Sequence, residues 1–464
     1  MNSNDAGLTT ATASPWMHLG TFDVANFGDC LFPYLFRAIL DEIDPRSDLD
    51  LASPTARSAH LVNSGLDLHS LEGGSKGLSM LSQYDNAVLG GGQVGTFSHE
   101  HGTYAHLSVF SAPPGLRLWA MPALASVRTG HNYFIYSVGI NEVPQPRRKL
   151  LTASFQAAAA SAVRDGVSAA RLQACGFEVD VVPDIITVLP LLDHRFPVLA
   201  AEATRDAVHR RLGDRYIVAQ CSRGYVASWG EDGLRTWVRQ IANLSRQLEA
   251  KVVLLPICHF LGDTDLLERI LPLFVEAGAL DPEIVLAPNV FDTLMVIRHA
   301  EAVVGTSLHV VLSAAAYDVP FLSTAVEHSG KHHACLEVLG LEGFHRERPD
   351  GFELSDFWNR DQVDWQPPAQ EATFAWWRRA QTSVPSPGSI AEATSTLEDW
   401  WKSVRWSEPA ETGPVVTGKM FLKLLYRLTY GRFPSEIGRP EESMVSFLDP
   451  NDFSLRGLPE SESR

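Results

Sequence analysis

The 464-residue sequence predicts an α/β protein made of two doubly wound halves, each a mostly parallel sheet with helices on both faces. Short β-branched runs alternate with stretches of helical periodicity over residues 15–195, and the alternation is repeated over residues 196–345. A chain of this length is also too long for one ordinary core, so two domains are expected. Residues 346–464 are expected to add a mostly helical, tryptophan-rich extension with a loose polar tail.

Composition excludes several classes of partner. Lys and Arg number 38 against 55 Asp and Glu, and the net charge of −17 argues against nucleic acid or an anionic membrane as the main partner. An anionic substrate would therefore need a local basic pocket. The five cysteines have no C-x-x-C spacing, and neither a signal-peptide pattern nor an apolar run of membrane-spanning length is present. These features predict a reduced, cytoplasmic protein.

The first predicted strand, Trp16–Phe22, leads into Asn26-Phe27-Gly28-Asp29, which opens a helix. Gly28 would let the backbone approach a ligand, while Asn26 and Asp29 offer polar atoms at the carboxyl end of the strand. The alternative interpretation is that Asp29 only caps the helix.

A second strand, Ala87–Leu89, runs into a triple glycine that includes Gly91 and Gly92. This loop is either a backbone surface for a ligand or a tight turn. We expect it to lie beside residues 26–29 at the carboxyl edge of the sheet. The other strands predicted in this half are Phe134–Val138, Ala162–Arg164 and Glu178–Val182.

Four residues after the triple glycine could suggest a metal: His99, Glu100, His101 and His106. Their spacing matches no standard metal site, so a polar loop near the site is predicted in place of a metal cluster.

The second half repeats the alternation of strands and helices. Its predicted strands are Tyr216–Gln220, Val252–Leu255, Ile284–Ala287 and Ala302–Val304. Arg223 follows the first of them, and its guanidinium matches a phosphate or a carboxylate bidentately, although an ordinary surface arginine is an equal alternative. His259 and Asp263 follow the second strand.

The last of these strands stops at Gly305-Thr306-Ser307, and a helix begins at once with Leu308. The backbone N–H groups at such a helix start suit a phosphate or a carboxylate, and His309 adds a titratable proton. The alternative is that Thr306 or Ser307 is only an N-cap and His309 an ordinary turn residue.

Taken in order, these motifs resemble those of the polysaccharide pyruvyl transferase family. The resemblance rests on N-F-G-D, L-G-G-G, Y-S-V-G, A-V-R-D-G-V-S, V-V-G-T-S-L-H and Y-D-V-P, and it extends from Met17 to Leu341. It implies a GT-B-like pair of Rossmann-like domains that takes pyruvate from phosphoenolpyruvate and places it as a ketal on a sugar. The acceptor would bind the first domain and phosphoenolpyruvate the second, with no further cofactor and no nucleic acid.

The resemblance also assigns residues. His309 matches the family's histidine at the helix start, Arg223 its phosphoenolpyruvate-binding arginine, and Lys331 a lysine after the last strand. Ser307 stands where the family commonly has arginine. One positive charge is therefore missing or supplied elsewhere, with Lys331, His332 and His333 as candidates.

Ketal formation needs a proton for the methylene carbon, a base for two hydroxyls, and donors for the anionic groups. His309 and Asp29 are the predicted catalytic residues, and no metal is required. The predicted substrate-binding residues are Arg223, Thr306, Ser307, Lys331, His332, Asn26, Gly28, Gly91, Gly92 and His259. A nucleotide-sugar glycosyltransferase on the same architecture and an inactive binding subunit remain alternatives.

The extension has two features of its own. Its tryptophans are expected to dock a helix on the second domain, with sugar stacking as the lesser alternative; they are Trp358, Trp365, Trp376, Trp377, Trp400, Trp401 and Trp406. Residues 418–432 predict a basic amphipathic helix. It would lie on the inner face of a membrane that carries a lipid-linked sugar, or dock on the acidic body or a partner.

Overall fold

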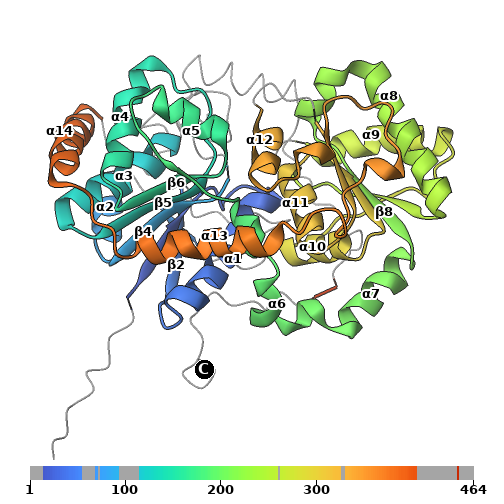
Figure 1. Cartoon of the computed structure of the whole chain (residues 1–464), viewed down its shortest axis with the longest axis horizontal. Coiled ribbons are helices and arrows are strands. Elements are labelled where there is room, and N and C mark those ends of the chain that lie inside the picture. Colours follow the sequence, from blue (N-terminus) through green and yellow to red (C-terminus); the bar gives the residue numbers. More distant parts are fainter. Residues whose placement is uncertain are drawn as a thin grey trace, which may run out of the picture.

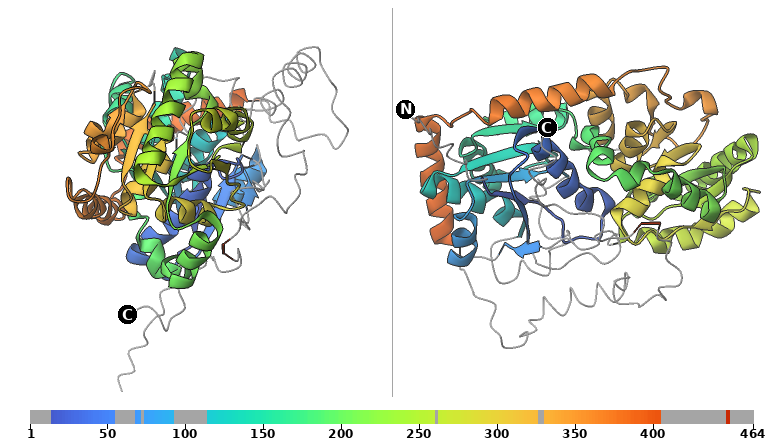
Figure 2. Two further views of the ribbon diagram at one scale, coloured as in Figure 1. Left: turned by 90° about the vertical axis from the view of Figure 1, so that its right-hand side faces the viewer. Right: turned by 90° about the horizontal axis from the view of Figure 1, so that it is seen from below.

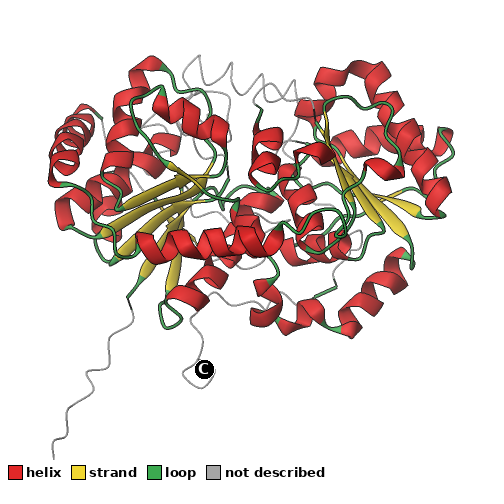
Figure 3. Ribbon diagram, viewed as in Figure 1, coloured by secondary structure: helices red, strands yellow, loops and turns green. Residues whose placement is uncertain are grey.

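The computed structural model describes residues 14–54, 68–71, 74–92, 114–259, 262–325, 330–404 and 447–448. The chain forms two α/β halves that lie side by side, and each half has a parallel sheet between layers of helices (Figures 1 and 3). The predicted loop at residues 99–106, the predicted helix at 418–432 and Trp406 lie outside the described residues.

The first half contains a seven-stranded sheet in the order β3-β2-β1-β4-β5-β6-β7, and the pairing is parallel throughout. The strands are β1 (Trp16–Leu19), β2 (Leu49–Ser53), β3 (Leu68–Ser70), β4 (Asn86–Gly90), β5 (Asn132–Val138), β6 (Ala160–Val163) and β7 (Asp180–Val181). The order reverses between β1 and β4, which is where a doubly wound sheet places its ligand-binding loops.

The helices of this half and of the connection to the next are α1 (Phe27–Ile43), α2 (Ser75–Leu81), α3 (Pro114–Thr129), α4 (Gln145–Gln156), α5 (Gly166–Gln173), η1 (Ile185–Val188), α6 (Leu191–Arg195), η2 (Pro197–Ala200) and α7 (Glu202–Leu212). Helix α1 is capped by Asn26, whose side chain accepts a hydrogen bond from the backbone N–H of Gly28. Asp29 is therefore inside the first turn of α1 and is not the cap.

The second half contains a six-stranded sheet in the order β10-β9-β8-β11-β12-β13. Its strands are β8 (Tyr216–Gln220), β9 (Lys251–Leu254), β10 (Glu283–Ile284), β11 (Ala302–Gly305), β12 (Phe321–Thr324) and β13 (His345–Arg346). Its helices are α8 (Arg223–Leu248), α9 (Asp263–Glu276), α10 (Val290–Arg298), α11 (Leu308–Ala316), α12 (Lys331–Val338), η4 (Glu342–Phe344) and η5 (Leu354–Asp356). Both sheets reverse after their third strand in spatial order, so the predicted pair of Rossmann-like, GT-B-like domains is confirmed.

Two C-terminal helices, α13 (Gln366–Ala380) and α14 (Pro387–Ser403), return to the first half (Figures 1 and 2). The Trp377 ring lies 6.1 Å from Trp16 and 5.5 Å from Phe36, and α14 packs on α3 and α4. The prediction that the tryptophans dock a helix on the second domain is thus wrong for α13 and α14. The physical reason is that β1, β5 and α1 leave an aromatic face that α13 covers.

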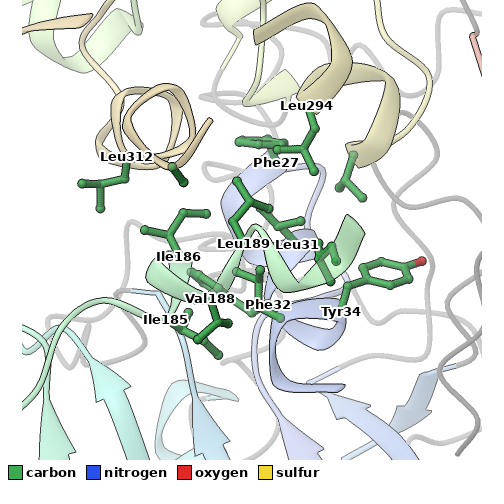
Figure 4. Packing of buried hydrophobic residues seen from close by; sticks show 14 of the residues in the cluster. Phe27, Leu31, Phe32, Tyr34, Ile185, Ile186, Val188, Leu189, Leu294 and Leu312 are labelled. Carbon is green, nitrogen blue, oxygen red and sulfur yellow. The ribbon is translucent and has the colours of Figure 1, made fainter. Parts of the chain in front are cut away.

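The two halves share one hydrophobic cluster. Phe27, Leu31 and Phe32 of α1 belong to the same buried set as Leu294 of α10 and Leu312 of α11 (Figure 4). Since protein interiors are close-packed, this shared core fixes the start of α1 against the second half.

In the part of the chain that the structure describes, no helix combines the length and the apolar character needed to cross a bilayer.

Candidate active site

The side chain of His309, which belongs to the second half, contacts residues of the first half. It occupies the second position of α11, directly after β11 and the loop that follows it, and its ring lies on Gly28 at the start of α1. A Cβ atom on Gly28 would stand 2.1 Å from Nδ1 of His309, so only glycine fits there. The ring of Phe32 meets the imidazole edge-on at 5.0 Å, and the His309 side chain is 13% exposed.

Two buried charges of the first half surround the other ring nitrogen. Nη1 of Arg164, the residue after β6, lies 3.2 Å from Nε2 of His309 and 2.8 Å from Oδ2 of Asp184. The same carboxylate oxygen is 3.8 Å from Nε2. Both charged side chains are almost completely buried, so their attraction is only weakly screened.

Burial and these charges decide which groups are ionised. Burial lowers the pKa of His309, the carboxylate of Asp184 opposes this, and the positive charges of Arg164 and Lys331 lower it again. Burial alone would raise the pKa of Asp184, but the nearby imidazole of His309 and the charge of Arg164 hold it well below its usual range. The site thus combines a neutral imidazole with a permanent ion pair.

Asp29 is a second titratable group at the same place. Its Oδ2 accepts a hydrogen bond of 3.0 Å from Nδ2 of Asn26, and burial raises its pKa to about 7 against the opposing effects of Thr21 and Arg164. A carboxyl group with a pKa near neutrality can both accept and donate a proton under physiological conditions.

The triple-glycine loop lies against α1, as the sequence predicts. Gly91 and Gly92 have φ angles of +79° and +70°. A Cβ on Gly92 would stand 2.7 Å from Oδ1 of Asp29, and one on Gly91 would stand 2.3 Å from the ring of Phe32. Both the backbone conformation and the close approach therefore require glycine.

In the second half, the backbone before His309 is held by Gln220, the last residue of β8. Its Oε1 accepts hydrogen bonds from the backbone N–H groups of Thr306 and Ser307, at 3.1 and 2.9 Å. Oγ1 of Thr306 in turn accepts from the backbone N–H of Ser222. Two of the amides predicted to hold an anion thus already have a partner, and the Ser307 side chain makes no capping hydrogen bond.

The loop after β9 joins the halves at a second point. Buried Asp263 accepts hydrogen bonds from the backbone N–H groups of Ile257 and Cys258, and burial raises its pKa to about 7. The carbonyl of Ile257 accepts a hydrogen bond of 2.9 Å from the backbone N–H of Phe27. This contact places the start of α1, and with it Asp29, against the second half.

The remaining predicted residues have different surroundings. Lys331 is the first residue of α12, partly exposed, and close enough for its charge to act on His309. Arg223 is exposed at the start of α8, next to Ser222. His259 is buried with Nδ1 3.0 Å from Oγ1 of Thr264, and buried His332 stacks on His345 with ring centroids 6.0 Å apart.

The structure therefore brings together six of the predicted residues: His309, Asp29, Asn26, Gly28, Gly91 and Gly92. Sequence reasoning did not assign Arg164, Asp184 and Gln220 to the site. A signal was present for the first two, since Arg164 ends the predicted strand Ala162–Arg164 and Asp184 follows the predicted strand Glu178–Val182.

Among the described residues, no group of three or more His, Cys, Asp or Glu side chains is arranged to hold a metal ion.

Comparison with known protein families identifies the family of this chain. The model of the polysaccharide pyruvyl transferase family matches residues 26–328, which is well over half of the sequence. The chain belongs to this family. The match includes Asp29, Arg164, Asp184 and His309, and it ends shortly before Lys331.

Solved structures similar to this pyruvyl transferase family member include an epimerase and a heptosyltransferase. A UDP-GlcNAc 2-epimerase from Neisseria meningitidis, bound to UDP-GlcNAc, is 10% identical with a TM-score of 0.46, over 83% of this chain and 98% of that one. The ADP-heptose LPS heptosyltransferase II of E. coli is 15% identical with a TM-score of 0.39, over 79% of this chain and 98% of that one. No curated protein matches the sequence.

Proposed function

We propose that this pyruvyl transferase family member takes pyruvate from phosphoenolpyruvate and places it as a ketal on a sugar of a polysaccharide or of its lipid-linked precursor. The proposal is supported by family membership and, above all, by one observation. The imidazole of His309 from the second half lies directly on Gly28, the neighbour of Asp29 in the first half. Two groups able to act on one substrate are thus brought together from residues far apart in the sequence.

Asp29 is the proposed carrier of protons. With a pKa of about 7, its carboxylate accepts a proton from a sugar hydroxyl and its carboxylic acid donates one to the methylene carbon of phosphoenolpyruvate. Asn26 orients this carboxyl group through its hydrogen bond to Oδ2. Gly28, Gly91 and Gly92 act as shape-giving backbone, because without side chains they let His309, Phe32 and Asp29 itself pack closely at the site.

The anionic donor is proposed to bind on the second half. Phosphoenolpyruvate carries a carboxylate and a phosphate, and Lys331, the first residue of α12, is a cation whose charge lowers the pKa of His309. Arg164 is a poor anchor for an anion because Asp184 already balances its charge. Lys331 therefore takes the place of the arginine that Ser307 replaces, with Arg223 as the second cation at the end of β8.

The proposed reaction balances as follows. One proton is added to the methylene carbon, and the first sugar hydroxyl forms a C–O bond to C2. The C–O bond to phosphate then breaks, and the second hydroxyl closes the ketal. Of the two hydroxyl protons, one replaces the proton given to the methyl group and one leaves with inorganic phosphate.

A thermal-shift titration with phosphoenolpyruvate and with a uridine diphosphate sugar tests this function. A ligand at a hundred times its dissociation constant stabilises the folded state by about 2.7 kcal/mol. We expect phosphoenolpyruvate alone to raise the melting temperature, and His309→Ala and Arg223→Ala to abolish the rise. The exposed residues His194 and Arg210, substituted in the same way, are the matched controls and keep the rise.

A shift with the nucleotide sugar alone would replace the proposal with a glycosyltransferase. No shift with either ligand would indicate a binding subunit without activity.

A further inference from the structure

The two nitrogens of the His309 ring have very different surroundings, and this bears on the reaction proposed above. Nη1 of Arg164 stands 3.2 Å from Nε2. A guanidinium has only N–H donors and never accepts, and Oδ2 of Asp184, at 3.8 Å, is too far from Nε2 to accept a hydrogen bond, so Nε2 presents its lone pair to Arg164. A neutral imidazole with an accepting Nε2 carries its proton on Nδ1.

Arg164 cannot turn away from the ring, because its other contacts fix it. Asp184 binds the same Nη1 at 2.8 Å, and the second oxygen of Asp184 accepts a hydrogen bond from the backbone N–H of Ile186. Asp165 lies 3.9 Å from Nε of Arg164 and is itself fixed as the N-cap of α5. The guanidinium also packs over Gly139, where a Cβ would stand 3.1 Å from Nη2.

The opposite side of the ring is different. Nδ1 lies over Gly28 and, within the described ranges, makes no hydrogen bond with another residue. The side chain is 13% exposed. Nδ1–H is thus the group that can meet a substrate, next to Asp29.

We propose that Arg164, anchored by Asp184, is a positioning residue that holds His309 in the neutral Nδ1–H tautomer. On this proposal, which rests on the proposed function, His309 acts on phosphoenolpyruvate as a hydrogen-bond donor to an anionic oxygen. It does not hand over the proton, because a neutral imidazole that gave up Nδ1–H would become an imidazolate. The proton for the methylene carbon then comes from Asp29, and His309 stabilises negative charge on the carboxylate or on the departing phosphate.

The tautomer can be measured without any activity. In protein labelled with ¹⁵N-histidine, two-bond ¹H–¹⁵N spectra at pH 7 distinguish a protonated Nδ1 from a protonated Nε2, and H309N identifies the signals of His309. We expect the Nδ1–H form in the wild-type protein. In R164M/D184N, where the guanidinium and its closest carboxylate partner are both removed, we expect this preference to be lost.

The matched control is R195M. Arg195 forms an equally close pair with Asp41, at 2.7 Å and mostly buried in the same half, but it does not contact His309. R195M should therefore keep the Nδ1–H tautomer. If the double variant does not fold, R164K replaces it, because an ammonium group cannot reproduce the planar contact with both Asp184 and the ring.

A second measurement tests the donor role. In H309N, the side-chain amide places an N–H group near the position of Nδ1, and this amide cannot transfer a proton. We expect H309N to keep most of the thermal shift caused by phosphoenolpyruvate, and H309Q and H309A to lose at least tenfold in affinity.

An Nε2–H tautomer in the wild-type protein would overturn the proposal, and so would an H309N variant that binds no better than H309A. If phosphoenolpyruvate does not shift the wild-type protein, the proposed function fails, while the tautomer measurement still decides the role of Arg164.

Discussion

The two halves have the same strand order around the same switch point, yet their strand ends differ in chemistry. In the first half, the segments after the strands carry the ionisable groups Asp29, Arg164 and Asp184. Arg164 forms an ion pair with Asp184, whereas Asp29 is hydrogen-bonded to Asn26 and has a raised pKa. The second half ends β8 and β11 in uncharged residues, and Oε1 of Gln220 accepts hydrogen bonds from the backbone N–H and from Oγ1 of Thr306. One topology therefore supports two tasks: the first half supplies the buried charges, and hydrogen bonds of the second half fix the loop that presents His309.

The halves also differ in how they are covered. The first sheet obtains its last layer from α13 and α14, which follow the second sheet in the chain. On the second sheet, Trp358, which precedes α13 in the chain, packs on Phe321 of β12 with ring centroids 5.5 Å apart. Four substitutions test whether the two halves differ in this way.

The largest effect is expected from Trp377→Ala. The ring is fully buried against Trp16, Phe36, Phe134 and Tyr136, and its removal should lower the free energy of unfolding by about 3–5 kcal/mol. Chemical denaturation measures this. Val384→Ala, in a side chain that is 82% exposed, should change it by less than about 0.5 kcal/mol. Equal small effects would show that α13 does not complete the first half.

Gly28→Ala should disturb the contact between the halves. The new Cβ would stand 2.1 Å from Nδ1 of His309, so the ring must move. A displacement of this size should slow phosphate release from phosphoenolpyruvate by about 100-fold in the presence of the acceptor. Gly388, at the same position in α14, has open space around its Cβ direction, and Gly388→Ala should leave the rate unchanged. If the Gly28→Ala variant kept its activity, the position of the His309 ring would not matter for the reaction.

Gln220→Met tests the loop before His309. Without Oε1, the backbone N–H of Ser307 loses its acceptor, while that of Thr306 keeps the backbone carbonyl of Gln220, and the free energy of unfolding should fall by about 2 kcal/mol. Gln173→Met, at an exposed position in α5, is the control and should have almost no effect. Should both variants unfold at the same denaturant concentration, Oε1 of Gln220 does not hold this loop.

Asp29→Asn tests the charged half. The folded state keeps a proton on Asp29 up to a pKa of about 7, whereas the unfolded chain releases it near pH 4. The stability that this proton contributes is present below pH 4 and is lost as the pH rises through 7. Relative to the wild type, Asp29→Asn should therefore be more stable at pH 8 than at pH 4 by about 2–4 kcal/mol, since one pKa unit corresponds to about 1.4 kcal/mol.

Denaturation at the two pH values measures this difference, with exposed Asp361→Asn as the control. A pH-independent difference would place the Asp29 carboxylate in an environment as polar as water.

The sequence predicts the strands at the centre of each sheet best. Strand β8 has the predicted bounds, Tyr216–Gln220, because a buried parallel strand is a continuous apolar run between polar breaks. Strand β2, Leu-Asp-Leu-Ala-Ser, was not predicted, since a single charged residue interrupts the run. Helix α3, with Pro122 inside it, was not predicted either, because proline normally marks a helix end.

The site was predictable in part for a similar reason. Loops at strand ends identify Asp29, Gly91 and His309, because the carboxyl edge of the sheet brings them together whatever the details of packing. The contact of Arg164 with His309 joins residues 145 apart in the chain, and no local pattern encodes which buried arginine meets which ring. Gln220 was read as an ordinary strand residue, since its role depends on a loop 86 residues later.

The return of α13 to the first half also has a consequence for synthesis. The aromatic face of Trp16, Phe36 and Phe134 is complete once β5 has left the ribosome, but Trp377 follows more than roughly 200 residues later. At about 5–20 residues per second, translation leaves this face uncovered for about 10–50 s. During that interval the nascent first half exposes an apolar surface, so chaperones should bind the growing chain until its last helices emerge.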